Sequence, residues 1–442
     1  MRSGNFRRRA VPLIAAVALV AAACGGAEDS TTDANDETAA PAPAPSETVD
    51  EEGNTELHVF HFKVNIQTQW QNLTDEYSAE QGDVTFVNEI IGGGNAWLPI
   101  LKSKFAADRG PDIFIVEGPA QAAEFSDYLS DLTGEAWTES VFPWAIEPLT
   151  QDGQILGMPV NVEGYGYIYN KAIFDDAGVT EKPTTVSELR AAAEQLESAG
   201  YVPFGTGYGV WWVSGLHLMN IGFARQEDPQ AFLQQALARE VTFADDPVFQ
   251  QLGDLVQVTL DHSEPDPLTT DVPAQNQLFF DGEAAMIQQG NWREIQILAA
   301  DPEADIGLVP MSINDDATDG DRIAVGVPFY FVVNSESSEA EQAEAREFLN
   351  WLVTSETGKR YLVEEFGFIP AYDGIEATGL GGVSQDILSY SAEGKIIPWV
   401  FGSFPDGSPQ EMSEAFQRHV AGQATWAETL AEFDAIWDRL AG

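Results

Sequence analysis

Short apolar runs alternate with amphipathic segments along the first part of the body of this chain. Apolar, β-forming runs occupy residues 57–62, 84–91 and 113–116. Between the first two runs, bulky apolar side chains such as Trp70 and Leu73 recur at helical spacing. The order strand, helix, strand, helix, strand predicts a parallel sheet with helices on both faces.

Polar or glycine-rich loops follow the three runs, at residues 63–67, 92–97 and 117–119. Ligands of open α/β sheets bind beyond the carboxyl ends of the strands, so these loops are candidates for a binding site. The glycine triplet at 92–94 does not predict a phosphate site. It lacks the Lys-Ser/Thr pair of a P-loop and the glycine spacing of a dinucleotide-binding loop.

A strictly alternating stretch at residues 157–171 predicts a long strand. Asn161 and Glu163 fall on one face of it, followed by a row of tyrosines. A carboxylate and an amide beside aromatic rings suit a neutral polyhydroxyl ligand, because the oxygens accept its hydroxyl hydrogens and the rings cover its C–H faces. A half-buried strand with a polar rim fits these residues equally well. The tyrosines themselves are Tyr165, Tyr167 and Tyr169.

Tryptophans mark three later segments of the chain. Trp211 and Trp212 follow a predicted strand and lie among glycines, where two exposed indoles would be costly without a partner. Trp292 ends a Gly-Asn-Trp loop after a predicted strand, and Trp399 lies in an aromatic, glycine- and proline-rich segment. Core packing remains an alternative for each of these side chains.

The chain has 442 residues, enough for two or three domains, with 71 acidic and 21 basic side chains and a formal net charge of −50. So acidic a surface repels nucleic acid and anionic lipid and disfavours anionic substrates. We therefore expect a neutral or cationic ligand and no nucleic-acid partner. The acidity also fits a saline habitat, where counterions screen the self-repulsion.

The N-terminus is typical of an exported protein. Arginines at positions 2 and 7–9 precede an apolar segment at 11–23 that is too short for a comfortable membrane span. Cys24, the only cysteine of the chain, follows three alanines, and this arrangement resembles a bacterial lipobox. The resemblance implies a signal peptide at 1–23 and lipidation of Cys24. Residues 24–54 would form an acidic, proline-rich, disordered tether at the extracellular face of the cell membrane.

The order of several segments resembles the family 1 extracellular solute-binding proteins, the sugar-binding components of bacterial ABC importers. The resemblance covers residues 55–442 and implies an α/β, two-lobed, periplasmic-binding-protein-like fold with an interdomain cleft and a hinge. We expect 55–160 and 284–327 to form the N-terminal lobe, and 161–283 and 328–442 the C-terminal lobe. The segments that carry the resemblance are 110–113, 157–171, 183–185, 282–292, 306–310, 348–356 and 367–371.

The resemblance also implies roles for individual side chains. Glu163 would accept sugar hydroxyls where the chain crosses between lobes, and Trp292 would stack on a sugar ring. Glu117, Asn65 and Gln67 occupy loops that touch ligand in the family. Weaker matches to the pattern place Trp211, Trp212 and Trp399 among the ligand contacts.

The function implied is therefore binding rather than catalysis: a monomeric lipoprotein that captures a sugar or oligosaccharide and delivers it to an ABC permease, with no cofactor or metal. Two alternatives remain open. Carboxylates with aromatic rings also bind polyamines and other cations, and a pair of carboxylates would suffice for an extracytoplasmic glycoside hydrolase. No zinc-protease motif or Gly-x-Ser-x-Gly elbow is present in the sequence.

Overall fold

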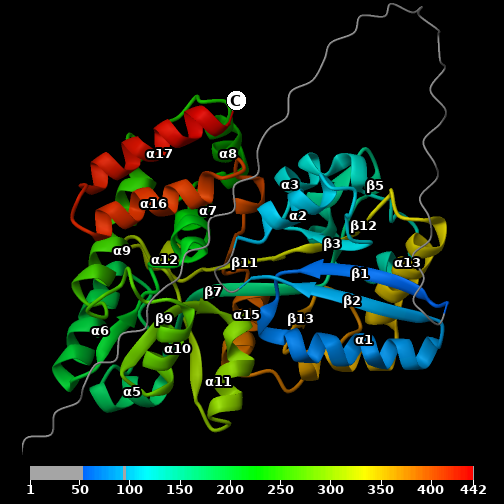
Figure 1. Ribbon diagram of the computed structural model, residues 1–442. Helices are drawn as coiled ribbons and strands as arrows, with labels where there is room; N and C mark the ends of the chain where they lie inside the picture. The colour runs from blue at the N-terminus through cyan, green and yellow to red at the C-terminus, as the bar shows by residue number, and fades with distance from the viewer. Residues whose placement is uncertain (1–52, 93–95, 442) are drawn as a thin grey trace, which may run out of the picture. The chain divides into compact units, whose positions relative to one another are not determined.

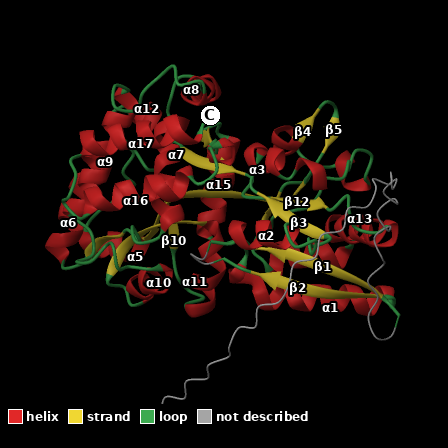
Figure 2. Cartoon of the chain, turned by 45° about the horizontal axis from the view of Figure 1, so that its top comes forward, coloured by secondary structure: helices red, strands yellow, loops and turns green. Residues whose placement is uncertain are grey.

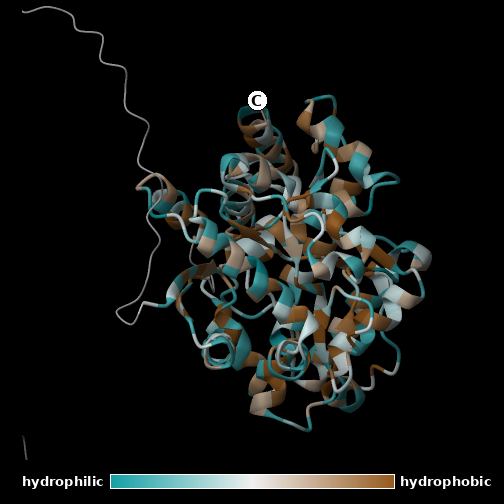
Figure 3. Cartoon of the chain, turned by 90° about the vertical axis from the view of Figure 1, so that its right-hand side faces the viewer, coloured by the Kyte–Doolittle hydropathy of each residue, from teal (hydrophilic) through white to brown (hydrophobic). Residues whose placement is uncertain are grey.

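The computed structural model describes residues 53–92 and 96–441. The predicted signal peptide, Cys24 and nearly all of the predicted tether lie outside the described residues. Within the described ranges, the helices are all too short or too polar to cross a bilayer. Figure 2 shows the strands enclosed by helices, and Figure 3 shows apolar residues gathered on the inner elements.

Five strands form the first sheet, in the order β2, β1, β3, β12, β6. β1 is parallel to both β2 and β3, as the strand–helix alternation predicts, and β12 is antiparallel to β3 (Figure 1). The strands are β1 (Thr55–His61), β2 (Val84–Ile90), β3 (Ile113–Val116), β6 (Met158–Pro159) and β12 (Tyr330–Val333).

Helices cover both faces of the first sheet. α1 (Gln67–Gln81) and α13 (Glu339–Thr354) share one face, where Trp70 and Phe348 have ring centroids 6.1 Å apart. α2 (Leu98–Phe105) and α3 (Pro119–Glu124) lie on the other face, where Phe105 packs on Phe114 of β3 at 4.9 Å. The alternating side chains of the strands therefore reach two separate apolar layers.

The second sheet has the order β14, β11, β7, β9, β8, with β10 and β13 also paired to β7. Its central strand is β7 (Asn161–Asn170), the alternating stretch of the sequence, which is antiparallel to β9, β10 and β11. The other strands are β8 (Val202–Gly205), β9 (Ala284–Gly290), β10 (Ile306–Val309), β11 (Ile323–Gly326), β13 (Ile369–Pro370) and β14 (Ile396–Pro398).

The remaining elements are mostly helical. Those before residue 300 are α4 (Pro143–Ile146), α5 (Lys171–Ala177), α6 (Val186–Ala199), α7 (Met219–Ala224), α8 (Pro229–Leu237), α9 (Pro247–Asp261), α10 (Val272–Phe280) and α11 (Glu294–Ala300). Those after it are α12 (Ala317–Gly320), α14 (Glu356–Arg360), α15 (Gly382–Ala392), α16 (Ser408–Val420) and α17 (Trp426–Leu440). A small hairpin joins β4 (Thr150–Gln151) to β5 (Gln154–Ile155).

Thr185 is the N-cap residue of α6. The Thr185 hydroxyl accepts a hydrogen bond from the Glu188 amide at 3.2 Å. The Glu188 carboxylate accepts a hydrogen bond from the backbone N–H of Thr184 at 2.9 Å. The N-terminus of α6 is therefore capped, but by a contact shifted one residue from a capping box.

The chain passes between the two sheets at short segments. Val160 alone separates β6 of the first sheet from β7 of the second, and residues 327–329 connect β11 back to β12. The side chains of Tyr165 and Tyr167, which follow on β7, are 1% and 0% exposed and belong to the core of the second sheet.

Strand pairing differs from the expected grouping of the later segments. Residues 284–327 were assigned with the first sheet, but β9, β10 and β11 pair with β7 in the second. Residues 328–442 were assigned with the second sheet, but β12 pairs with β3 and α13 packs on β1. Apolar β-forming runs such as 330–333 suit either sheet, so their partner is set by tertiary packing and not by local pattern.

Candidate functional site

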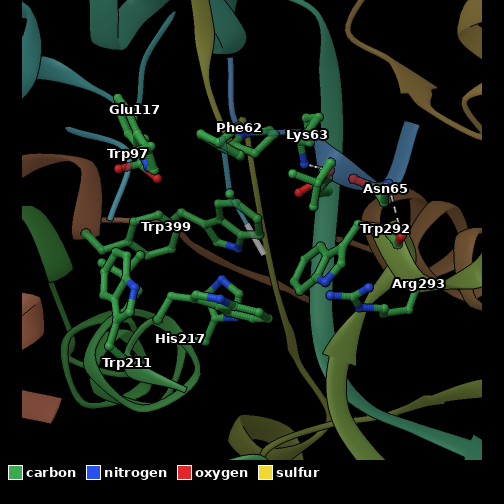
Figure 4. A pocket seen from close by; sticks show the side chains of 17 residues that line it. Phe62, Lys63, Asn65, Trp97, Glu117, Trp211, His217, Trp292, Arg293 and Trp399 are labelled. Atoms are coloured by element: carbon green, nitrogen blue, oxygen red, sulfur yellow. Dashed lines mark hydrogen bonds and ion pairs between the residues drawn. The ribbon is translucent and has the colours of Figure 1, made fainter. Parts of the chain in front are cut away.

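A cavity of about 130 Å³ lies between loops of the first sheet and elements of the second (Figure 4). Its upper wall in that view holds the loops after β1 and β3, and its lower wall holds tryptophans, a histidine and an arginine. The lining residues are Phe62, Lys63, Val64, Asn65, Gly92, Trp97, Glu117, Glu163, Trp211, Trp212, Leu216, His217, Trp292, Arg293, Pro328, Trp399 and Phe401.

Most of the side chains singled out from the sequence come together here. Glu163, Trp292, Glu117, Asn65, Trp211, Trp212 and Trp399 all line the cavity. Gln67 does not line it: this residue begins α1 and is exposed to solvent. The helical turn points Gln67 away while the preceding turn, Val64–Ile66, keeps Asn65 at the cavity wall.

A buried ion pair crosses the cavity wall. The ammonium of Lys63, just after β1, contacts the carboxylate of Glu163 on β7, and the two side chains are 6% and 3% exposed. The amide of Asn161 donates to the same Glu163 oxygen at 3.0 Å. Glu163 is thus held by two donors and joins the first sheet to the second.

The aromatic side of the cavity is organised around His217, which lies on the π-helical turn η5 (Val213–Leu218). Its ring stacks on Tyr165 with centroids 4.3 Å apart and an interplanar angle of 16°. Trp212 and Trp292 lie 5.3 and 5.1 Å from it. Burial, with the nearby Lys63 charge, lowers the pKa of His217 to about 3, so the imidazole is neutral at physiological pH.

Trp292 is held in place by hydrogen bonds at both its ends. Its indole N–H donates to Oε1 of Gln289 at 2.7 Å, and its backbone carbonyl accepts from the side chain of Asn65 at 3.3 Å. Gly290 permits this arrangement, because a Cβ there would lie 2.3 Å from the indole ring. The ring is therefore presented to the cavity in a fixed orientation, as a stacking platform requires.

The Glu117 residue, which directly follows β3, is half-buried. Gln121 donates to its carboxylate at 2.9 Å and accepts from its backbone N–H at 2.9 Å. Burial raises the pKa of Glu117 to about 7 against the lowering effects of Gln121 and Lys63. At neutral pH this carboxyl can therefore act both as a hydrogen-bond donor and as an acceptor.

Six further polar or aromatic residues line the cavity beyond the side chains predicted from the sequence: Phe62, Lys63, Trp97, His217, Arg293 and Phe401. Lys63 shares a loop with Asn65, and Arg293 directly follows Trp292, so adjacency to a chosen residue was the available signal. Trp97 begins the segment after the glycine triplet. His217 carries no such signal, since it comes to the cavity only through the packing of η5.

A second cavity of about 490 Å³ adjoins the first. The two share Trp97, Glu117, Trp211, Leu216 and Phe401 as walls. Beyond these shared walls it extends between α3 and the start of α16. The space open to a ligand is therefore longer than the aromatic chamber alone.

No group of three or more His, Cys, Asp or Glu side chains suited to a metal occurs in residues 53–92 and 96–441. His61 is buried against Trp70, with ring centroids 4.6 Å apart, and its pKa is lowered to about 3, first by burial and then by Lys63. His58 contacts the carboxylate of Glu56 at 3.2 Å. These two histidines thus have contacts within the protein.

Two archaeal proteins are among the relatives by sequence. An uncharacterized ABC transporter extracellular-binding protein of Pyrococcus horikoshii is 26% identical over 51% of this chain and 52% of its own length. The maltotriose-binding protein of Pyrococcus abyssi is 24% identical over 72% of this chain and 67% of its own length. The matched region thus spans about half of the first relative and two thirds of the second.

Solved structures share the fold. A chitin oligosaccharide binding protein aligns with a TM-score of 0.74 at 20% identity, covering 88% of this chain and 99% of that protein. The solute-binding protein RafE in complex with raffinose also aligns at 0.74, with 15% identity, covering 88% of this chain and 100% of RafE. These neighbours confirm the predicted two-lobed α/β fold, and by name they are binding proteins rather than enzymes.

The model of the bacterial extracellular solute-binding proteins matches residues 63–359, about two thirds of the chain. This match confirms the resemblance seen in the sequence. It favours neither the hydrolase nor the polyamine alternative. The chain therefore belongs to the bacterial extracellular solute-binding protein family.

Proposed function

We propose that this protein is the substrate-binding component of an ABC importer and captures a sugar or oligosaccharide in the cavity between its two sheets. The observation that carries the proposal is the composition of that cavity. Oriented indoles, above all Trp292, face the same space as the carboxylates of Glu117 and Glu163. Rings that cover C–H faces and oxygens that accept hydroxyl hydrogens are the two halves of sugar recognition.

In this proposal each of the two lobes is built around one of the two large sheets. The first comprises residues 55–160 with the returning β12 and α13, and the second comprises β7 to β11 with α15, β14, α16 and α17. A ligand that touches Asn65 in the first lobe and Trp292 in the second favours the closed arrangement of the lobes. A permease that recognises the closed form would then receive only the loaded protein.

The proposal has support from the named ligands of similar proteins. The Pyrococcus abyssi relative is named for maltotriose, and the structural neighbours include a chitin oligosaccharide binding protein and a raffinose complex. A sugar transporter of Bacillus licheniformis in complex with stachyose aligns with a TM-score of 0.71 at 17% identity, covering 87% of this chain and 100% of its own. The second cavity beside the first favours an oligosaccharide over a monosaccharide.

The test is a thermal-shift screen of the protein against a panel of mono- and oligosaccharides, followed by calorimetry and by product analysis for turnover. We expect at least one oligosaccharide to raise the melting temperature without being hydrolysed. Trp292→Ala should weaken the binding of that ligand by about 0.5–1.5 kcal/mol, which raises its Kd up to roughly tenfold. Trp144→Ala, at a half-exposed indole outside the cavity, is the matched control and should bind normally. Turnover of the sugar, or unchanged affinity in Trp292→Ala, would refute the proposed role.

We further propose that the mature protein is a monomer anchored to the outer face of the cell membrane through a lipidated Cys24. The basic, apolar and alanine-rich residues before Cys24 support this. Labelling with a palmitate analogue in cells should mark the native protein. Cys24→Ser should be unlabelled and released to the medium; a Cys24→Ser protein that stays membrane-bound would contradict the anchor.

A further inference from the structure

Arg293 is a buried cation with no carboxylate at ion-pair distance in the part of the chain that the structure describes. Burial lowers the pKa of Arg293, and the charge of Glu163 offsets this only in part. It closes the 3₁₀ turn η6 (Asn291–Arg293), lines the cavity and is 8% exposed. Its hydrogen bonds go to side-chain amide oxygens: Nη1 donates to Gln296 at 2.8 Å and Nε to Gln289 at 3.4 Å. Among residues 53–92 and 96–441 it forms no ion pair within 4 Å. Burying an unpaired charge is costly, so such a group needs a reason.

A second buried arginine, Arg225, has its positive charge neutralised by a carboxylate. Arg225 is 6% exposed and pairs with the Asp319 carboxylate at 3.3 Å. It also donates to the backbone carbonyls of Met311 and Arg322, at 2.9 and 3.2 Å. The two terminal nitrogens of Arg225 therefore bond protein oxygens, although its Nε has no partner among the described residues, whereas the guanidinium of Arg293 borders a cavity.

The side chains that line the cavity also carry more positive than negative charge. Lys63 and Arg293 both line it, while Glu163 is already paired with Lys63. The second carboxyl, Glu117, is only partly ionised at neutral pH because burial raises its pKa to about 7. Burial lowers the pKa of His217, and the positive charge of Lys63 across the cavity adds to this lowering. This local field persists despite the net charge of −50, because distant surface charges are screened beyond about 8 Å at physiological salt.

Arg293 also lies beside the stacking platform. The indole N–H of Trp292 and Nε of Arg293 both donate to the same oxygen of Gln289, at 2.7 and 3.4 Å. Figure 4 shows the guanidinium next to the indole ring. A pyranose ring stacked on Trp292 carries its substituents at the ring edge, so a carboxylate on that edge would reach the guanidinium.

We propose that the cavity selects an acidic sugar, with the carboxylate of a uronic-acid residue bound by Arg293 while its ring stacks on Trp292. The inference rests on the proposed function and narrows its ligand class. An arginine fork and a carboxylate form two parallel charge-assisted hydrogen bonds, which a neutral sugar cannot offer. The ligand would then be anionic, in contrast to the neutral or cationic ligand that the net charge of the chain suggests.

The experiment compares matched acidic and neutral sugars by calorimetry on the whole protein. The probes are pairs of equal length and linkage, such as digalacturonate with galactobiose and glucuronate-bearing xylo-oligosaccharides with the plain ones. We expect the acidic member of the bound pair to bind at least tenfold more tightly. Arg293→Gln should reduce this preference to less than threefold, and Arg293→Lys, which keeps the charge but loses the fork, should give an intermediate preference.

Arg190→Gln is the control for net charge. It removes one positive charge from a surface pair with Asp261, in which both side chains are about 40% exposed, and should leave the preference unchanged. The melting temperature of ligand-free Arg293→Gln separates ligand binding from a structural role. It should equal or exceed that of the wild type, because the variant removes an unpaired buried charge.

The possible outcomes distinguish the acidic-sugar inference from the proposed sugar-binding function. A neutral sugar that binds as tightly as its acidic partner, or a preference that survives in Arg293→Gln, overturns the acidic-sugar inference and leaves the proposed function standing. A lowered melting temperature with equal loss of both ligands assigns Arg293 a structural role and overturns it too. Failure of every sugar, acidic and neutral, refutes the proposed function itself.

Discussion

The ion pair between Lys63 and Glu163 offers the sharpest test of how the two sheets are joined. The two residues lie 100 positions apart, Lys63 just after β1 of the first sheet and Glu163 on β7 of the second, and their side chains are 6% and 3% exposed. Removing one member of such a pair leaves an uncompensated charge, at about 3–5 kcal/mol when the site is fully buried. Because both side chains border a cavity that water can enter, we expect Glu163→Gln and Lys63→Met each to cost about 3 kcal/mol.

The double variant should be far less destabilised than the sum of the single ones. With both charges removed, neither remains unpaired, so we expect a total cost of about 3–4 kcal/mol and a coupling energy of about 2–3 kcal/mol. The assay is urea unfolding of the ligand-free protein at pH 7. It should be followed by both fluorescence and circular dichroism, because coincident transitions are needed for a free energy of unfolding.

A surface pair supplies the control for this cycle. Arg190 and Asp261 lie 3.2 Å apart but are about 40% exposed, and such pairs contribute 0–1 kcal/mol. Arg190→Gln with Asp261→Asn should therefore show coupling below about 0.5 kcal/mol. If the Lys63–Glu163 cycle gave a value equally small, the pair would not join the sheets energetically and the reasoning from its burial would be wrong.

Two further predictions concern the walls of the cavities. Burial raises the pKa of Glu117 from 4.5 to about 7, so the folded state disfavours its ionised form, and stability should fall as pH rises from about 4.5 to about 7. Each pKa unit corresponds to about 1.4 kcal/mol of stability. Because Glu117 borders the cavity, solvent screens its charge, and we expect a smaller loss of stability of about 1.5 kcal/mol. Unfolding measured from pH 4.5 to 8 should show this slope in the wild type, and an equal slope in Glu117→Gln would contradict it. Ala120→Trp places an indole in the second cavity and should abolish any preference for longer over shorter oligosaccharides, measured by calorimetry, whereas Ala123→Trp on the exposed face of α3 should preserve it. Retention of the length preference in Ala120→Trp would show that ligands do not enter that cavity.

Local pattern predicted much of the fold because the relevant signals are short-range. The runs at 57–62, 84–91 and 113–116 became three strands of one sheet, with boundaries within two residues, and their order predicted the parallel pairing. The partner of the later strand at 330–333 could not be predicted in this way. Pairing is decided by which sheet edge the chain reaches after it crosses at 327–329.

The candidate site, too, could be predicted only in part from the sequence. Glu163 and Trp292 were found from motif resemblance, and both line the cavity. Gln67 was chosen for its loop but is turned outward by the start of α1. His217 was missed because a neutral, ring-stacked histidine differs in no sequence feature from an ordinary core histidine.

The sequence by itself determined the acidic character of the chain, its α/β class and the aromatic and acidic residues from which a binding site could be built. These follow from composition and periodicity, which each segment carries alone. Only the tertiary structure decided which residues meet: that Lys63 pairs with Glu163, and that Arg293, beside Trp292, has no carboxylate at ion-pair distance among the described residues. The physical reason is that charge compensation depends on distances of a few ångströms between distant segments. The net charge of −50 therefore describes the surface of the chain and not the field inside its cavity.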